Sequence, residues 1–191
     1  MFILKSKKFS IGSSLLITCS AILFGVSAFF PWWKMGFYAP QYPEGLNIIV
    51  YPTKLEGQID IINGLNHYIG MANFGEKNFP ELSYLGYIVI GLVVLTLLTA
   101  IIRNKAVLYG LISLITIGGL LGIYDLHHAL YKYGTNLDPH AAIKIKPFVP
   151  PIIGQNQVAN FTTHSLLGLG TYFILAAFVL LLIPLWKERK R

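Results

Sequence analysis

The sequence predicts an all-α integral membrane protein with four transmembrane helices, and three observations support that prediction. Of the 191 residues, 54% are hydrophobic and only 12% are charged, whereas a soluble domain carries about 25% charged residues. Four apolar stretches occur, each close to the roughly 20 residues needed to cross a ~30 Å hydrocarbon core. Basic residues gather at both ends of the chain, which predicts an even number of crossings.

The four apolar stretches set the bounds of the expected helices. The stretches span about 9–30, 82–102, 106–126 and 165–185, within a single membrane domain of residues 1–191. Helices are the expected spanning form because the alternating ten-residue pattern of a membrane barrel strand is absent. The first stretch also has the basic start and apolar run of a cleaved signal peptide, with a weak cleavage pattern at Val26-Ser27-Ala28. Cleavage of the first helix therefore stays open.

The distribution of charge predicts the orientation of the protein in the membrane. The two ends and the turn Arg103-Asn104-Lys105 hold one acidic residue, Glu188, and nine basic residues: Lys5, Lys7, Lys8, Arg103, Lys105, Lys187, Arg189, Lys190 and Arg191. The segments at about 31–81 and 127–164 hold six lysines and six acidic residues, and a seventh acidic residue, Asp125, lies at the outer end of the third stretch. This asymmetry predicts a multi-pass protein of the bacterial cytoplasmic (inner) membrane with both termini cytoplasmic, N-in/C-in. A nucleic-acid partner is not expected, because no binding motif or aromatic-interleaved basic stripe accompanies the net charge of +7.

The first outer segment contains signals for a small hairpin and a short helix. Asn47–Tyr51 has the composition of a strand, and the residues from Leu55 to Gln58 are expected to turn it back. Apolar residues then recur at 61, 62, 65, 68 and 69, which is a helical period. Asp60 is placed to cap this helix and Gly70 to weaken its end. We expect the helix to lie on the membrane surface.

One face of that expected helix carries possible metal ligands. Asn63, His67 and Met71 are spaced i, i+4, i+8 and so share a face. Imidazole and thioether groups together suit copper, particularly Cu(I). The alternative is that His67 hydrogen-bonds to a loop carbonyl and Met71 packs in a core.

A second group of polar residues lies where the third apolar stretch ends. Asp125, His127 and His128 follow one another at the expected outer membrane surface, and Asp125 could orient an imidazole ligand. The alternative is an interfacial ion pair, because a carboxylate near a helix C-terminus needs a partner such as His128 or Lys132. The candidate metal ligands are therefore His67, Met71, His127 and His128, with Asn63 and Asp125 as supporting residues.

The rest of the second outer segment is long and apolar, and prolines at 147, 150 and 151 exclude a regular helix there. We expect it to pack with the first outer segment into a small extracytoplasmic cap. All five histidines lie at or beyond the outer ends of the apolar stretches, so a haem site within the bilayer is not expected. The sequence contains no catalytic motif, and enzymatic activity is left uncertain, with no catalytic residue assigned.

Glycines occur within and beside the last two apolar stretches. Gly118, Gly119 and Gly122 lie in the third stretch, and Gly168 and Gly170 lie at the start of the fourth. Small residues allow the backbones of membrane helices to approach closely. Both groups therefore predict sites of close helix packing.

Four strings in the outer segments carry a resemblance to a known family. They are Tyr38-Ala-Pro-Gln-Tyr-Pro-Glu-Gly-Leu46, Asn63-Gly-Leu-Asn-His-Tyr-Ile-Gly-Met71, Tyr133-Gly-Thr-Asn-Leu-Asp-Pro139 and Pro150-Pro-Ile-Ile-Gly154. With the four-helix plan, they resemble the NosB-type four-helix membrane proteins encoded beside clade II nitrous oxide reductases in bacteria. The resemblance implies an accessory protein of the cytoplasmic membrane that supports periplasmic nitrous oxide reduction. Since that reductase is a copper protein, the resemblance also favours copper at His67 and Met71.

The favoured function is an integral membrane accessory protein for a periplasmic copper enzyme, acting in maturation, copper supply or docking. The expected partners are the lipid bilayer and other membrane or periplasmic proteins, including nitrous oxide reductase maturation components. One alternative is a membrane subunit of a quinol-linked electron-transfer complex, in which a histidine–aspartate pair accepts a proton from quinol. The other alternative is a purely structural membrane anchor without a ligand.

Overall fold

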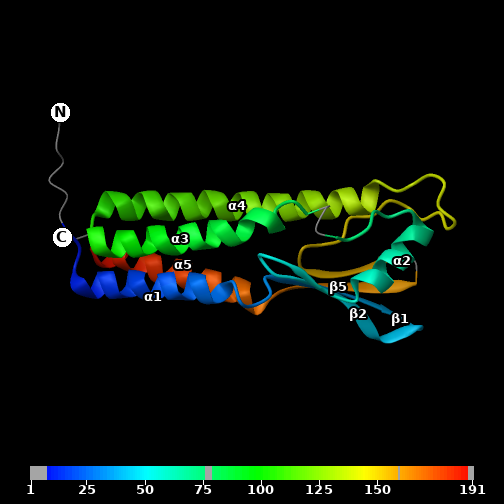
Figure 1. Ribbon diagram of the computed structural model, residues 1–191, viewed down its shortest axis with the longest axis horizontal. Coiled ribbons are helices and arrows are strands. Elements are labelled where there is room, and N and C mark those ends of the chain that lie inside the picture. Colours follow the sequence, from blue (N-terminus) through cyan, green and yellow to red (C-terminus); the bar gives the residue numbers. More distant parts are fainter. Residues whose placement is uncertain (1–7, 76–78, 159, 189–191) are drawn as a thin grey trace.

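The computed structural model describes residues 8–75, 79–158 and 160–188, and it overturns the all-α prediction. Within those residues the chain forms five helices and a five-stranded antiparallel sheet, so the fold is mixed α/β. Figure 1 shows an elongated molecule with a helical bundle at one end and the sheet at the other. We call these parts the bundle and the head.

The bundle consists of α1 (Ile11–Ser27), α3 (Leu82–Ile102), α4 (Lys105–Thr135) and α5 (Leu169–Lys187), which run side by side along the long axis (Figure 1). Three of them, α3, α4 and α5, are long and apolar enough to cross a membrane. Helix α1 is also apolar but has only 17 residues. It packs against both α3 and α5.

The bounds of three helices differ from those predicted. Helix α1 starts and ends two to three residues inside the expected 9–30, because the chain turns at Phe29 and Phe30 towards the sheet. Helix α4 continues to Thr135 instead of ending near 126. Helix α5 begins at Leu169 instead of 165, because the residues before it belong to a strand. The hydrophobicity of the sequence therefore locates each apolar stretch, but it does not show at which residue the helix begins or ends.

The sheet joins both outer segments of the sequence. Its strands are β1 (Trp33–Ala39), β2 (Tyr42–Val50), β3 (Leu55–Gly57), β4 (Gly154–Val158) and β5 (Phe161–Leu167), in the order β3-β2-β1-β5-β4. The expected hairpin corresponds to the antiparallel pair β2–β3. Strand β1 was not predicted, although Trp33 and Met35 are buried and alternate with exposed Lys34. This alternation is the ordinary mark of a strand with one buried face.

One face of the sheet is covered by helices and forms the core of the head. Helix α2 (Ile59–Ile69) places Ile62 against Leu46 and Ile48 of β2. The extension of α4 beyond the bundle places Leu130 against Trp33 and Met35. Helix α2 was expected to lie on the membrane surface, whereas its apolar face packs on the sheet (Figure 1). The apolar face of α2 is therefore buried inside the head, against the sheet.

The head is joined to the bundle by two direct connections, α1 to β1 and β5 to α5. At this joint the Gly168 N–H donates to the carbonyl of Trp32 at 2.8 Å, and the Gly170 N–H donates to Pro31 at 2.9 Å. The hydroxyl of Thr171 also donates to the Trp32 carbonyl, at 2.6 Å. A Cβ atom on Gly168 would lie 2.0 Å from the Pro31 oxygen. The antiparallel strands β1 and β5 therefore continue directly from the helices α1 and α5, and the chain is tightly packed where the strands and helices meet.

The glycines of α4 behave differently. A Cβ atom added at Gly118, Gly119 or Gly122 meets nothing within 4 Å. Every residue from Thr116 to Asp125 is exposed, so the middle of α4 stands away from its neighbours on all sides. The prediction of close helix packing is wrong for these glycines within the single chain, whereas Gly168 and Gly170 pack tightly, against a loop as well as a helix.

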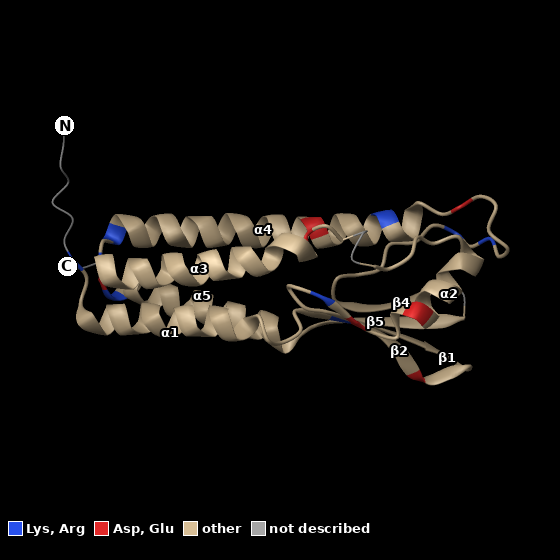
Figure 2. Cartoon of the chain, in the orientation of Figure 1, with Lys and Arg blue, Asp and Glu red and all other residues tan. Residues whose placement is uncertain are grey.

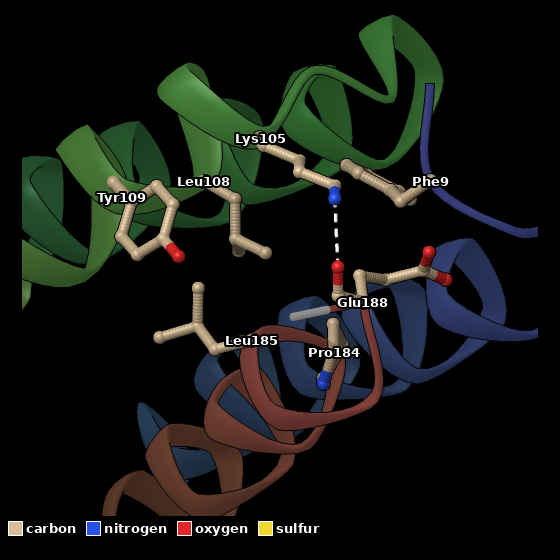
Figure 3. Close-up of a pocket in the computed structure, with 7 residues that line it drawn as sticks. All are labelled: Phe9, Lys105, Leu108, Tyr109, Pro184, Leu185 and Glu188. Atoms are coloured by element: carbon tan, nitrogen blue, oxygen red, sulfur yellow. Dashed lines mark hydrogen bonds between the residues drawn. The ribbon is translucent and has the colours of Figure 1, made fainter. Parts of the chain in front are cut away.

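The free end of the bundle is held by a buried carboxylate. Oε1 of Glu188 accepts hydrogen bonds from the Ser10 N–H at 2.9 Å and from the Ser13 hydroxyl at 2.8 Å. The Lys105 ammonium donates to the main-chain carbonyl of Glu188 at 2.7 Å (Figure 3). The hollow beside these groups measures about 10 Å³, space for no more than about one water. These hydrogen bonds tie the ends of α1, α4 and α5 together. The hollow between them has no room for a ligand.

Candidate functional site

The bundle is free of charge along most of its length. Helices α1 and α3 contain no charged residue, and in α4 none occurs between Lys105 and Asp125. These two residues are separated by about 30 Å of helix at 1.5 Å rise per residue, which equals the thickness of a hydrocarbon core. Figure 2 shows basic residues at the free end of the bundle and charges of both signs in and near the head.

Aromatic side chains mark the two boundaries of this uncharged zone. Tyr87 of α3, Tyr124 of α4 and Tyr172 of α5 are exposed near the head, and Tyr109 and Trp186 are exposed near the free end. Tyrosine and tryptophan are enriched where a membrane meets water, because their rings are apolar and their edges are polar. The bundle therefore has the surface of a membrane-spanning unit.

The predicted residues His67 and Met71 border one open hollow in the head. The hollow has a volume of about 440 Å³ and is lined by His67, Gly70, Met71, Ala72, Asn136, Leu137, Asp138 and Pro139. The two residues do not share a helical face, because α2 ends at Ile69 and Gly70 adopts a left-handed φ of 74°. His67 is exposed. Met71 is only 8% exposed and packs in the head core, so the packing interpretation holds for most of its side chain.

Asn63 does not support a ligand at this hollow. Its side-chain oxygen accepts the Phe74 N–H at 2.6 Å, and its side-chain nitrogen donates to the Phe74 carbonyl at 2.7 Å. Both ends of the amide are therefore used to hold the chain that follows α2. Asn63 and His67 lie one helical turn apart on α2, as expected, but Asn63 is not among the residues that line the hollow, because the segment after α2 folds back over Asn63.

Two residues that were not predicted lie at the same hollow or beside it. Asp138 lines the hollow, and its carboxylate accepts the His140 N–H at 2.8 Å. Nδ1 of His140 lies 3.4 Å from the same carboxylate oxygen. The backbone hydrogen bond from His140 lowers the pKa of Asp138, and the imidazoles of His140 and His67 lower it further. Asp138-Pro139-His140 is visible in the sequence, but nothing in the sequence places it beside His67.

Asp125, His127 and His128 lie elsewhere, exposed on α4. The ring of His128 stacks on Tyr124, with 6.0 Å between centroids. In the described part of the chain, Asp125 makes no ion pair or hydrogen bond with His128 or Lys132, so the expected interfacial ion pair is not formed. Across residues 8–75, 79–158 and 160–188, no group of three or more His, Cys, Asp or Glu side chains is close enough to hold a metal ion as it stands.

Within the residues that the structure describes, the helices cover one face of the sheet and none lies over the second face. It presents Lys34, Tyr38, Gln155 and Gln157, all of which are exposed. The Tyr38 ring lies edge-on to His164, with 5.2 Å between centroids. It also covers Gly36 and Gly45, where a Cβ atom would lie within 2.9 Å of the ring. We call this surface the open sheet face; it exposes these polar side chains beside Leu166 and is available for contact with another molecule.

Comparisons with known proteins add no family to this description. No protein-family model matches the chain, and no curated protein matches it. The bundle, the hollow and the open sheet face are therefore the basis for inferring function.

Proposed function

We propose that this chain is an integral protein of the bacterial cytoplasmic membrane that holds its head in the periplasm and serves a periplasmic copper enzyme as an accessory protein. The observation that carries the proposal is the uncharged bundle, which continues directly into a folded head through the Gly168 joint. A bilayer around the bundle then fixes the distance of the head from the membrane. Such an arrangement suits the docking of a soluble partner.

The proposed topology has four spans with both termini in the cytoplasm. Lys8, Arg103, Lys105 and Lys187 lie at the free end of the bundle, as the positive-inside rule requires of a cytoplasmic side. The other basic residues assigned to that side, Lys5, Lys7, Arg189, Lys190 and Arg191, lie outside the described residues. The burial of Ile17, Ala21 and Phe24 of α1 in the bundle favours a retained helix over a cleaved signal peptide.

The process served is proposed to be nitrous oxide reduction, and its support is the resemblance to NosB-type proteins. Three of the four resembling strings contribute to named features: Tyr38–Leu46 to the open sheet face, and Asn63–Met71 and Tyr133–Pro139 to the hollow. The open sheet face is the proposed docking surface for the enzyme or its maturation proteins, because the other face is covered by helices.

A second element of the proposal is copper contact at His67. His67 and Met71 border the same hollow, and imidazole with thioether suits Cu(I). Binding by so few ligands would be weak, which permits hand-over to a partner. The quinol-linked alternative has no comparable support, because His127 and His128 are exposed on α4 and His128 stacks on a tyrosine.

The experiment that tests this function is co-purification from mild detergent, joined to an activity assay. A tagged protein from its own bacterium is expected to bring down components of a periplasmic copper enzyme. A chain with Gln155→Ala, Gln157→Ala and Tyr38→Ala on the open sheet face should lose them while staying folded. Deleting the gene should lower nitrous oxide reduction. Unchanged reduction, with no co-purifying protein, would leave the structural-anchor alternative, and quinol oxidation by the purified complex would favour the electron-transfer role.

A further inference from the structure

We infer that the exposed side of α4 binds phosphatidylethanolamine of the outer membrane leaflet, with the lipid headgroup on Asp125, His128 and Lys132. The lipid class is set by its chemistry, an ammonium group with N–H donors next to a phosphate. Such a site goes beyond the proposed role at a copper enzyme, but it rests on the proposed placement of the bundle in a bilayer.

The site lies on one stripe of exposed residues along α4. Its members are spaced alternately four and three residues apart, which places them on one side of a helix. Leu130 lies on the opposite side of α4, where it is buried against Trp33 and Met35 of the sheet, so the stripe faces away from the head. We call it the α4 stripe; it consists of Leu114, Gly118, Leu121, Asp125, His128 and Lys132, all of which are exposed.

The α4 stripe changes from apolar to charged at Asp125, where the uncharged part of α4 ends (Figure 2). On the bundle side of this point, Leu114 is 54% exposed and Leu121 is 62% exposed. Beyond it, the stripe carries a carboxylate, an imidazole and an ammonium group within about 10 Å of helix. A phospholipid has the same order of parts, an apolar chain followed by a charged headgroup.

The charged groups of the α4 stripe are not paired with one another. Asp125 and His128 are spaced to meet on a helix, but in the described part of the chain Asp125 makes no ion pair or hydrogen bond with His128 or Lys132. The His128 ring stacks on Tyr124 instead, with 6.0 Å between centroids. A stacked imidazole keeps its nitrogen atoms at the ring edge, where an N–H can donate. Groups of both signs are therefore available to a ligand that also carries both signs.

Phosphatidylethanolamine matches these groups better than the other common phospholipids do. Its ammonium group would donate to the Asp125 carboxylate, and its phosphate would accept from His128 and Lys132. Helical side chains tilt towards the helix N-terminus, so Lys132 reaches back towards the bilayer. Hydrogen bonds between charged groups are stronger than those between neutral groups. Phosphatidylcholine has no N–H to donate, and phosphatidylglycerol carries a net negative charge that Asp125 repels.

A second copy of the chain fits the α4 stripe less well. Two copies in one membrane point the same way along the membrane normal, so a two-fold axis would set Asp125 beside Asp125 of the other copy. Like charges at such a contact are destabilising. A membrane helix of another protein would need opposite charges in register with both Asp125 and Lys132. A lipid brings both charges in one headgroup and surrounds the bundle at high concentration.

The test measures which lipid stays bound to the purified full chain. The protein in mild detergent is mixed with equal amounts of phosphatidylethanolamine, phosphatidylcholine and phosphatidylglycerol of identical acyl chains, and bound lipid is counted by native mass spectrometry. Wild type should retain phosphatidylethanolamine about two- to fivefold over each of the others, as expected of an exposed ion pair. Asp125→Asn should abolish this preference, and Asp125→Glu should keep most of it.

Lys132→Gln separates the two contacts of the headgroup. All three lipids carry the phosphate, so this variant should weaken the retention of each about two- to fivefold. The preference for phosphatidylethanolamine, which depends on Asp125, should remain. The matched control is Asp60→Asn/Lys144→Gln, which changes two exposed charges of the head and should retain lipid as wild type does.

Equal retention of the three lipids by wild type, or an unchanged preference in Asp125→Asn, would overturn the lipid site. Loss of the preference in the head control would overturn it as well. A membrane protein that is lost from Asp125→Asn while lipid retention stays unchanged would show that the α4 stripe docks a helix instead. The proposed function fails separately, in co-purification through the open sheet face and in nitrous oxide reduction, and Asp125→Asn should leave both unchanged.

Discussion

The bundle and the head of this protein both have an apolar core, but they differ in the side chains that they expose. In the bundle the exposed residues are mostly Leu, Ile and Val, while Ser13, Ser20, Ser27, Thr96 and Thr99 are buried. In the head most buried residues are apolar, including Leu46, Ile48 and Ile62, and the open sheet face exposes mainly polar side chains. One chain therefore carries two surfaces made for two different surroundings, lipid and water.

Serine hydroxyls on the inner side of the bundle are hydrogen-bonded to the backbones of neighbouring helices. Ser20 donates to the Ala177 carbonyl of α5 at 2.8 Å, and Ser14 donates to the Ala100 carbonyl of α3 at 2.6 Å. These small side chains let α1 approach both neighbours, and each hydroxyl has a carbonyl partner. Close packing of this type holds membrane helices together, because lipid gives no hydrophobic force between them. An exposed apolar residue is therefore well placed in the bundle, where it faces lipid, and unfavourable in the head, where it faces water.

Two isoleucines of equal exposure give the largest expected difference between the parts. Ile117 in the middle of α4 and Ile153 in the head are both 58% exposed. Ile117→Arg should make membrane insertion of α4 less favourable by about 3 kcal/mol, because it puts a charge in the hydrocarbon core. Ile153→Arg should change the stability of the head by no more than about 0.5 kcal/mol. The yield of protein integrated into membranes measures both; equal yields for the two variants would break the comparison.

Alanine substitutions at two glycines test how tightly the chain packs at the joint between bundle and head and in the middle of α4. Gly168→Ala should lower stability by about 1–3 kcal/mol, since its Cβ atom would collide with the Pro31 carbonyl. Gly119→Ala is the control and should stabilise α4 by about 0.5–1 kcal/mol, because alanine is the better helix former and its Cβ atom meets nothing. Thermal unfolding in detergent reports both changes. A Gly119→Ala variant destabilised as much as Gly168→Ala would show that α4 packs more closely than described.

The hydroxyls inside the bundle give a smaller expected effect. Ser20→Ala removes a buried hydrogen bond between two helices and should cost about 0.5–1 kcal/mol. Thr116→Ala removes a hydrogen bond from an exposed side chain to its own helix, at Ile112, and should change stability little. Denaturation of the two variants in the same detergent gives the comparison. A larger loss for Thr116→Ala would mean that its side of α4 is buried against a partner.

How much of the fold was predictable differs between the two parts. The helices of the bundle were predicted because uninterrupted apolar length is required by a bilayer and is visible locally. Strand β5 was missed because Phe161-Thr-Thr-His-Ser-Leu-Leu167 has weak alternation, and its last residues merge with the apolar run of α5. Its pairing with β1, more than 120 residues away, is decided by tertiary contacts. Sequence patterns therefore indicate whether a segment faces lipid or water, but they do not indicate which distant strand it pairs with.

The candidate site was predictable only in part for the same reason. His67 and Met71 were selected as neighbours on a helix, and both border the hollow, but the helix ends between them at Gly70. Asp138 and His140 could not be placed beside them, because their contact depends on hydrogen bonds from Asp138 to Gly70 and from Ile143 to Tyr68. Residues from two separate segments that line one hollow cannot be recognised as neighbours from the sequence alone.

The smallest expected effect is that of a surface ion pair in the head. The side chain of Lys54 pairs with Glu56 of β3, which lowers the pKa of Glu56 below its ordinary 4.5 and raises that of Lys54 above 10.5. The pair therefore stabilises the head at neutral pH, and this contribution is lost as pH falls through the lowered pKa of Glu56. Glu56→Gln should be slightly less stable than wild type at neutral pH and indistinguishable in acid or high salt. A difference that persists in acid would contradict this assignment.

The most direct test of the central claim is the labelling of single cysteines from outside intact cells. In a Cys19→Ser background, Gln157→Cys places a thiol on the exposed part of the head and Lys8→Cys places one at the free end of the bundle. A maleimide that enters the periplasm but does not cross the cytoplasmic membrane should label Gln157→Cys in intact cells and Lys8→Cys only after the membrane is opened. Labelling of Lys8→Cys in intact cells, or protection of Gln157→Cys, would contradict a periplasmic head carried on a four-helix membrane bundle.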